Sequence, residues 1–442
     1  MMMMTRLPLL IALLLPAPAS LALNGRLAAQ GTPLTLNGAV ALGRSRGVQG
    51  EIARLNARAA DHRSGQRRSD FLPTIAGSAS WSRQTNNLTE FGLSLPGVPP
   101  VTDPFGLYAF RARAQEQIFD GSVLARARSA TAEANAAEYD ATAAGDAAGV
   151  GAGFAWLRAV SAEETVRARE ADSLVAAGLL QMARDQLQAG VSAAIDVTRA
   201  EVNSAVIRGQ LVAARNARAQ SRLELNRALV FPADTVLTLS DTLDATTDDL
   251  PSDATAAVAF AIAHRPETAA ERERARAIAL QRSAIVWENL PSVAGFGQVN
   301  KAGKTLDSLH YSWNVGVQVS VPLFDGFRRQ RRMQEQSARL EAQSVRERDL
   351  HAQVEVEARS ALLDLASSRE AVEVAAERLR LAEQELRQAE ERFRAGAAGS
   401  VETSQAQLGL FSARDGLIQT KVNLGSARVR AYRALGALDQ MR

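Results

Sequence analysis

The residue types that most often carry chemistry are scattered along this 442-residue chain and form no recognisable catalytic pattern. There is no cysteine, which excludes disulfides and thiolate metal sites. The histidines lack the spacing of metal ligands, so we expect no metal and no cofactor. They are His62, His264, His310 and His351. Because the sequence contains no phosphate-binding loop and no nucleophile–base pair, the chain is predicted not to be an enzyme.

The overall charge is nearly balanced, with 51 Lys and Arg residues against 48 Asp and Glu residues. A net charge of +3 gives no support for nucleic acid as a partner. Aromatic residues make up only 5% of the chain, while Ala, Arg, Glu and Gln are abundant. This composition favours long helices over a large globular core, and the many carboxylates on such helices are expected to be solvated.

The first 22 residues have the composition of a secretory signal peptide. Arg6 precedes an apolar run over 7–15, and small residues follow over 16–22. Cleavage after Ala19 or Ala22 fits this pattern. The apolar run is shorter than the roughly 20 residues that a membrane-spanning helix needs, which disfavours a membrane anchor.

The remainder of the chain contains one pattern twice. The motif Leu-Pro-Thr-Ile-Ala-Gly at 72–77 returns as Leu-Pro-Ser-Val-Ala-Gly at 290–295, and Phe-Asp-Gly occurs at both 119–121 and 324–326. A duplication of this extent indicates an internally symmetric protein. The predicted division is a signal peptide at 1–22, a first repeat at 23–230, a linker at 231–253, a second repeat at 254–437 and a tail at 438–442.

Each repeat is predicted to be mostly helical. Apolar and small residues recur at spacings of three and four from Val354 to Phe393, which is the pattern of a coiled-coil seam. The longest helix would extend on the order of 100 Å, and each long helix would reverse at a turn containing glycine. The predicted long helices span 121–187 and 327–394, their return helices span 194–229 and 400–435, and shorter helices span 37–70 and 254–289.

Strand-like alternation with a period of two appears within 290–324. One face of the last predicted strand carries Tyr311, Trp313, Val315, Val317 and Val319 and continues to Leu323. The other face is polar or small. This alternation fits two structures equally well, a membrane strand with one face toward lipid and a half-buried strand of a soluble sheet. A second hairpin is predicted within 72–119.

The context of the strands favours the first interpretation, a strand in a membrane barrel. Two hairpins supply four strands, which cannot close a barrel, and an open sheet edge is not tolerated in lipid. Several copies of the chain would therefore have to complete one barrel. The proline-containing loop at 85–105 is expected outside the cell, and the two Phe-Asp-Gly motifs are expected to be periplasmic strand–helix hinges whose aspartates cap the next helix. The hinge residues are Asp120, Gly121, Asp325 and Gly326.

Several individually weak motifs occur in order along the chain. They are Pro33-Leu34-Thr35-Leu36, Leu72-Pro73, Arg265-Pro266-Glu267 and Val321-Pro322-Leu323-Phe324-Asp325-Gly326. Together with the duplication, they resemble the TolC-type outer-membrane efflux proteins. The resemblance implies a mostly α fold with a transmembrane β-barrel part. Long coiled-coil helices would form an α-barrel, and each protomer would add four strands to a trimeric 12-stranded β-barrel.

The same resemblance implies a function and a set of partners. Such proteins are homotrimeric exit channels that contact outer-membrane lipid in Gram-negative cells and extend into the periplasm. They conduct substrate passively from a periplasmic adaptor (membrane fusion) protein and an inner-membrane transporter of the RND or ABC type, in tripartite efflux pumps or type I secretion systems. The alternative is a periplasmic coiled-coil adaptor or structural protein without a membrane barrel, which would have no use for four strands of membrane-spanning length.

The resemblance also implies candidate site residues. The adaptor-docking tips would include Gly190, Val191, Gly396 and Ala397. The gate candidates at the periplasmic entrance are Glu402, Asp196 and Gln405, the last at a position where the family has a second carboxylate. Three Glu402 carboxylates near a threefold axis would repel one another and attract cations. The alternative is that Glu402 is an ordinary solvated helix residue.

Overall fold

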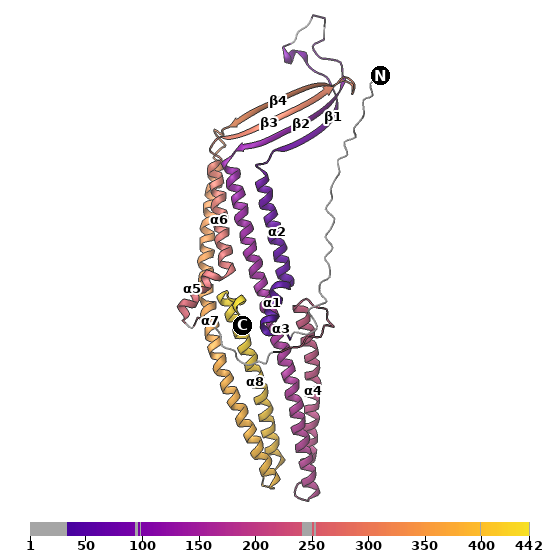
Figure 1. Ribbon diagram of the computed structural model, residues 1–442, viewed down its shortest axis with the longest axis vertical. Helices are drawn as coiled ribbons and strands as arrows, with labels where there is room; N and C mark the ends of the chain where they lie inside the picture. The colour runs from indigo at the N-terminus through magenta and orange to yellow at the C-terminus, as the bar shows by residue number, and fades with distance from the viewer. Residues whose placement is uncertain are drawn as a thin grey trace.

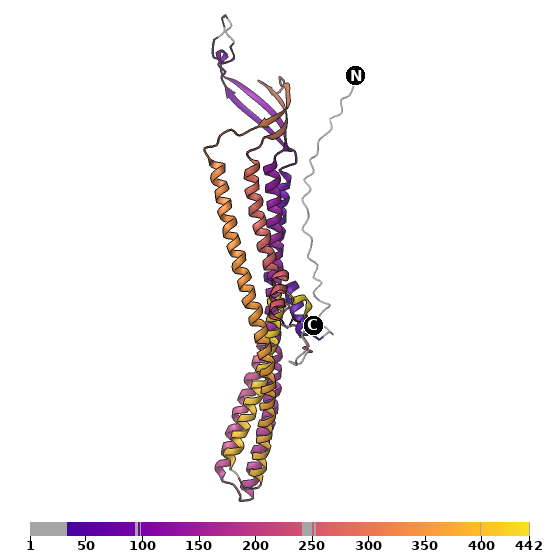
Figure 2. The ribbon, with the colours of Figure 1, turned by 90° about the vertical axis from the view of Figure 1, so that its left-hand side faces the viewer.

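The computed structural model describes residues 33–92, 96–97, 99–240, 250–251, 253–397 and 399–441. The predicted signal peptide at 1–22 lies outside them, as do 241–249 and 252 of the predicted linker. The molecule is elongated, with a β-sheet at one end and the turns of two helical hairpins at the other (Figure 1). A second view shows the helices of both hairpins lying side by side in the half of the molecule that contains those turns (Figure 2). None of the described helices combines the length and apolar character needed to cross a membrane.

Four long helices form the two hairpins that the sequence predicts. They are α3 (Gly121–Gln188), α4 (Ala194–Ala228), α7 (Arg328–Arg394) and α8 (Ser400–Leu435). Helix α3 packs against α4, α7 packs against α8, and α3 also contacts α8. The predicted seam of α7 is well buried near its two ends, at residues such as Val354 and Leu386, and only partly buried between 368 and 379.

The two shorter helical segments are each broken once, at places that the sequence prediction did not mark. The resulting helices are α1 (Leu36–Arg46), α2 (Val48–Ser69), α5 (Ala254–His264) and α6 (Pro266–Trp287). The first break is at Gly47, where the chain passes so close to α3 that an added Cβ would lie 2.5 Å from the Cβ of Ala148. The second precedes Pro266, because proline lacks a backbone N–H and pushes Arg265 into an extended conformation.

Four antiparallel strands form one sheet in the order β1-β2-β3-β4. They are β1 (Thr74–Gln84), β2 (Phe105–Phe119), β3 (Ser292–Gly303) and β4 (His310–Ser320). The prediction carried the last strand to Leu323, but β4 ends at Ser320, shortly before Pro322, which cannot donate a ladder hydrogen bond. Among the described residues, β1 and β4 each have a strand partner on one side only.

The main apolar core lies near the middle of the molecule, where the short helices pack on the long ones. Trp156 of α3 is only 1% exposed, and its indole N–H donates a 2.9 Å hydrogen bond to the carbonyl of Leu34. A second apolar cluster, which includes Leu386 and Leu410, lies between the two hairpins closer to their turns. These two clusters fix how the hairpins lie beside each other and therefore where their turns meet.

Candidate functional site

The two hairpin turns lie next to each other at the end of the molecule farthest from the sheet (Figure 1). Gly190 and Gly396 adopt left-handed backbone conformations, with φ of 74° and 69°, which a glycine adopts without strain. A Cβ on Gly396 would lie 3.5 Å from the side chain of Val191, so the predicted tips are in contact range. Val191 is 63% exposed and Ala397 is also exposed, so both can reach a partner.

Asp196 connects the two tips within one chain. Its carboxylate accepts a hydrogen bond from the Ser400 hydroxyl and one of 3.3 Å from the backbone N–H of Ala193, and its side chain is only 16% exposed. Close by, Asn203 of α4 donates to the buried Gln407 of α8. The predicted gate residue Asp196 is therefore placed between the hairpins, where it bonds the start of α4 to the start of α8.

Glu402 and Gln405 lie on the first turns of α8. One Glu402 oxygen lies 3.3 Å from Nε of Arg392, and the two side chains are 43% and 59% exposed. An ion pair this exposed is worth about 0–1 kcal/mol, so it leaves Glu402 free to take other partners. Gln405 is exposed and neutral. The structure thus brings one carboxylate and one amide to solvent at the tip, with Arg392 partly balancing the charge.

A buried ion cluster that the sequence does not predict joins α3 to α8. Asp172 is fully buried and accepts hydrogen bonds from Arg169 at 2.8 Å and from Arg414 at 2.6 Å. Arg169, itself 8% exposed, also bonds Asp415. Burial raises the pKa of Asp172, although the hydrogen bond from Arg414 and the charge of Arg169 oppose that rise. In the sequence these residues look like any others on the charged helices, so no signal set them apart.

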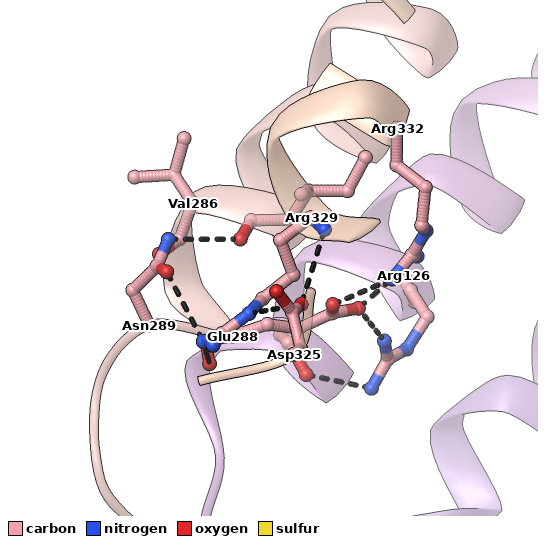
Figure 3. A network of polar contacts seen from close by, with 9 residues as sticks. Arg126, Val286, Glu288, Asn289, Asp325, Arg329 and Arg332 are labelled. Atoms are coloured by element: carbon pink, nitrogen blue, oxygen red, sulfur yellow. Dashed lines mark hydrogen bonds and ion pairs between the residues drawn. The ribbon is translucent and has the colours of Figure 1, made fainter. Parts of the chain in front are cut away.

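Both hinge aspartates accept hydrogen bonds at the start of the following helix, and Asp325 of the second hinge belongs to a second polar network (Figure 3). At the first hinge, Asp120 accepts from the N–H of Ser122 over 2.8 Å and so caps α3. At the second, Asp325 accepts from the backbone N–H of Arg329 over 3.1 Å and from its guanidinium over 2.8 Å. The hydrogen bond from that guanidinium is the main cause that lowers the pKa of Asp325. Gly326 has φ of 68°.

Glu288 is the centre of the network in Figure 3. It accepts from Arg126 of α3 over 2.9 Å and from Arg332 of α7 over 2.6 Å, and therefore ties three helices together beneath the sheet. Gly121 is needed nearby because a Cβ there would lie 2.3 Å from the ring of Trp287. The sequence identified Gly121 as a hinge residue but gave no reason to select Glu288 or Trp287.

The predicted lipid-facing residues all lie on one face of β4 and are strongly exposed in the single chain. The exposed fractions are 64% for Tyr311, 65% for Trp313, 72% for Val315, 65% for Val317 and 62% for Val319. Apolar side chains exposed over a continuous strand indicate a surface that is covered by something other than water. No group of three or more His, Asp or Glu residues in the described part of the chain is placed to hold a metal ion.

Comparison with known proteins gives one matching family and several solved structures of similar architecture. The family model described as outer membrane efflux protein matches residues 40–229 and 261–437. The chain is similar to the outer membrane channel CmeC of Campylobacter jejuni, with 18% identity over 91% of this chain and 85% of that one and a TM-score of 0.77. It is similar to the outer membrane protein VceC of Vibrio cholerae, with 18% identity, coverage of 91% and 96%, and a TM-score of 0.76. No curated protein sequence matches the chain significantly.

A third similar structure is the open state of the MtrE outer membrane channel of Neisseria gonorrhoeae, with 19% identity, coverage of 91% and 89%, and a TM-score of 0.76. At these identities the solved structures show the fold, which is mostly helical with four antiparallel strands in each chain. The family match covers most of the sequence and shows the class, an efflux channel of the outer membrane with its helices extending into the periplasm. The chain therefore belongs to the outer membrane efflux protein family.

Proposed function

We propose that three copies of this chain close one passive duct, through which substrate leaves the periplasm without energy from the chain itself. The observation that carries this proposal is the open sheet. Each chain supplies four strands, and β1 and β4 have unpaired outer edges among the described residues. In lipid, each unsatisfied backbone group costs several kcal/mol, so the edges must pair with other copies. Three copies supply twelve strands, and the long hairpins of the same copies continue the duct into the periplasm.

The tips are proposed to dock on a periplasmic adaptor protein, which connects the duct to an inner-membrane transporter of the RND or ABC type. The exposed apolar side chains of Val191 and Ala397 at the far end of the molecule support this role, because they offer contact area to a partner protein. The duct would serve a tripartite efflux pump or a type I secretion system. A periplasmic adaptor or structural protein, the alternative raised by the sequence, does not fit a chain of an outer-membrane family.

Docking is tested by Val191→Arg, which adds a charge at an exposed position without disturbing a left-handed glycine. We expect it to reduce adaptor capture in a detergent pull-down at least tenfold while native gels still show the trimer. The matched control is Val212→Arg on α4, which is 69% exposed and lies away from the turn, and which should leave capture unchanged. Equal capture by all three proteins would contradict the docking role of the tips.

We further propose that Glu402 contributes a cation-attracting charge at the periplasmic entrance. The proposal is supported by its exposed carboxylate, whose ion-pair partner among the described residues is the solvent-exposed Arg392. Glu402→Gln should lower the preference for cations in planar-bilayer recordings from that side. Glu377→Gln is the control, because Glu377 forms a similar exposed ion pair, with Arg380, higher on α7. An unchanged cation preference in Glu402→Gln would show that the Glu402 carboxylate does not act at the entrance.

A further inference from the structure

The register of the sheet places two arginines on its polar face. Arg111 of β2 pairs with Ser78 of β1 and Asn300 of β3, and Asn300 in turn pairs with Ser312 of β4. Residues that pair directly across neighbouring strands share a face of the sheet. Arg111 therefore lies in a row of serine and asparagine side chains. Because alternate residues of a strand share a face, Arg113 lies on the same side.

The row of Arg113 is also neutral apart from the arginine. Arg113 pairs with Ala76 and Gln298, and Gln298 pairs with Asn314. The other Arg, Lys and Glu residues of the four strands lie on the opposite face. They are Arg83, which pairs with Gly106, Glu116, which pairs with Gly295, and Lys301, which pairs with Tyr311. Among the described strand residues, the polar face thus carries two permanent positive charges and no carboxylate.

The polar face must be the one that lines the duct. The opposite face carries Trp313, Val315 and Val317, which are all more than 60% exposed in the single chain. An arginine facing lipid at mid-membrane costs about 2–4 kcal/mol, so turning the sheet around would place two such charges per chain in lipid while exposing the aromatic and valine side chains to water. Both arginines are exposed in the single chain and have no ion-pair partner among the described residues.

We propose that Arg111 and Arg113 form two rings of positive charge in the outer part of the duct, and that these rings favour the exit of anionic solutes over cationic ones. The proposal rests on the proposed trimeric duct, in which three copies would contribute six guanidinium groups to one lumen. Arginine has the chemistry for this role because its guanidinium stays charged at any physiological pH and binds carboxylates and phosphates.

The rings and the proposed entrance charge at Glu402 lie at opposite ends of the molecule, because the strands form one end and the hairpin turns form the other (Figure 1). Salt screens charges over about 8 Å at physiological ionic strength, so the two ends act as separate filters of opposite sign. A reversal potential measured across the whole duct would combine both filters. The arginine rings therefore need a local measurement.

The absence of cysteine allows such a measurement, since a single introduced thiol is unique. Ser312→Cys places it in the row of Arg111, two strands away, which is about 10 Å. In intact cells the thiol is modified from outside with two methanethiosulfonate reagents, one carrying a sulfonate and one a trimethylammonium group. A local potential of about +1 kT speeds the anion and slows the cation by about 2.7-fold each. The rate of the anionic reagent divided by that of the cationic reagent should therefore fall about sevenfold when both arginines are changed to glutamine.

The matched control is Lys301→Gln in the same Ser312→Cys background. It removes one positive charge from the neighbouring row but from the opposite face, and it should change the ratio less than twofold. An equal ratio with and without the arginines would overturn the inference while leaving the duct intact, because the thiol is still reached from outside. Failure of both reagents to reach Cys at 312, in chains that still form the trimer on native gels, would instead overturn the proposed lumen and the inference together.

Discussion

Asp172→Ala removes the central carboxylate of the buried ion cluster and should weaken the contact between the two hairpins. Asp172 is fully buried on α3 and holds both Arg169 and Arg414. Removing its carboxylate leaves Arg414 without this partner and leaves Arg169 with Asp415 alone. Breaking a buried ion pair by deleting one member costs about 3–5 kcal/mol, because the remaining charge stays desolvated. Arg169 keeps one carboxylate and Arg414 is 22% exposed, so we expect the lower end, about 3 kcal/mol.

The assay is hydrogen–deuterium exchange, read by mass spectrometry on peptides around 165–180 of α3 and 408–420 of α8. A loss of about 3 kcal/mol in local opening free energy corresponds to an exchange rate about 150-fold higher. The control is Asp415→Ala, which removes a carboxylate that is 51% exposed from the same cluster. Arg169 keeps its bond to the buried Asp172 in this variant, and the lost carboxylate is half in solvent, so we expect a cost of about 1 kcal/mol, or about a fivefold increase.

The difference in exchange between the two variants tests whether burial sets the strength of the cluster. If Asp172→Ala and Asp415→Ala raise exchange equally, burial does not set the strength of this cluster and the reasoning fails. Asp172→Asn provides a further check because it keeps the shape and one acceptor oxygen. Burial already raises the pKa of Asp172, so its charged form is partly disfavoured and the neutral amide should cost less than alanine.

Two further predictions concern the middle of the molecule and the first hinge. Burial raises the pKa of Glu267, but the hydrogen bond and charge of Arg433 outweigh it, so the pKa is lower than the ordinary value of 4.5. The stabilisation by Glu267 is therefore complete above about pH 4.5 and is lost as the pH falls through the lowered pKa. The difference in unfolding free energy between wild type and Glu267→Gln, measured by denaturant unfolding, should shrink over that range. A difference that stays constant with pH would contradict this prediction. Gly121→Ala should destabilise the chain by about 1–3 kcal/mol and change Trp287 fluorescence, because the new methyl group would collide with the indole. Gly151→Ala, which meets nothing within 4 Å on the same helix, should instead be neutral or stabilising, and similar losses in both variants would contradict the packing argument.

The long elements could be predicted from the sequence because their signals are local and repeated. The seam from Val354 to Phe393 and the alternation from Tyr311 to Val319 each depend on many residues in one pattern, and α7 and β4 follow them closely. The helix break before Pro266 was also readable in principle, since proline restricts the residue before it. The break at Gly47 was not, because it depends on how closely α1 and α2 approach Ala148 of α3.

The polar clusters could not be predicted because their members are distant in sequence. Arg169 and Asp415 are separated by 246 positions, and Arg126 and Glu288 by 162. On a helix rich in Arg and Glu, the few charged residues that become buried have no distinguishing local pattern. Asp196 shows the converse problem, because the sequence singled it out as a gate candidate but gave no sign of its bond to Ser400.

The number of chains in the assembly tests the central claim most directly. Four strands per chain leave open edges, and two or three copies could in principle close them. A barrel of eight strands is filled by its own side chains, so only a larger one leaves a continuous lumen. Native mass spectrometry of the protein extracted from the outer membrane in mild detergent should give one species of three mature chains. A stable species of two chains, or a single chain that stays folded in the membrane, would contradict the proposed duct.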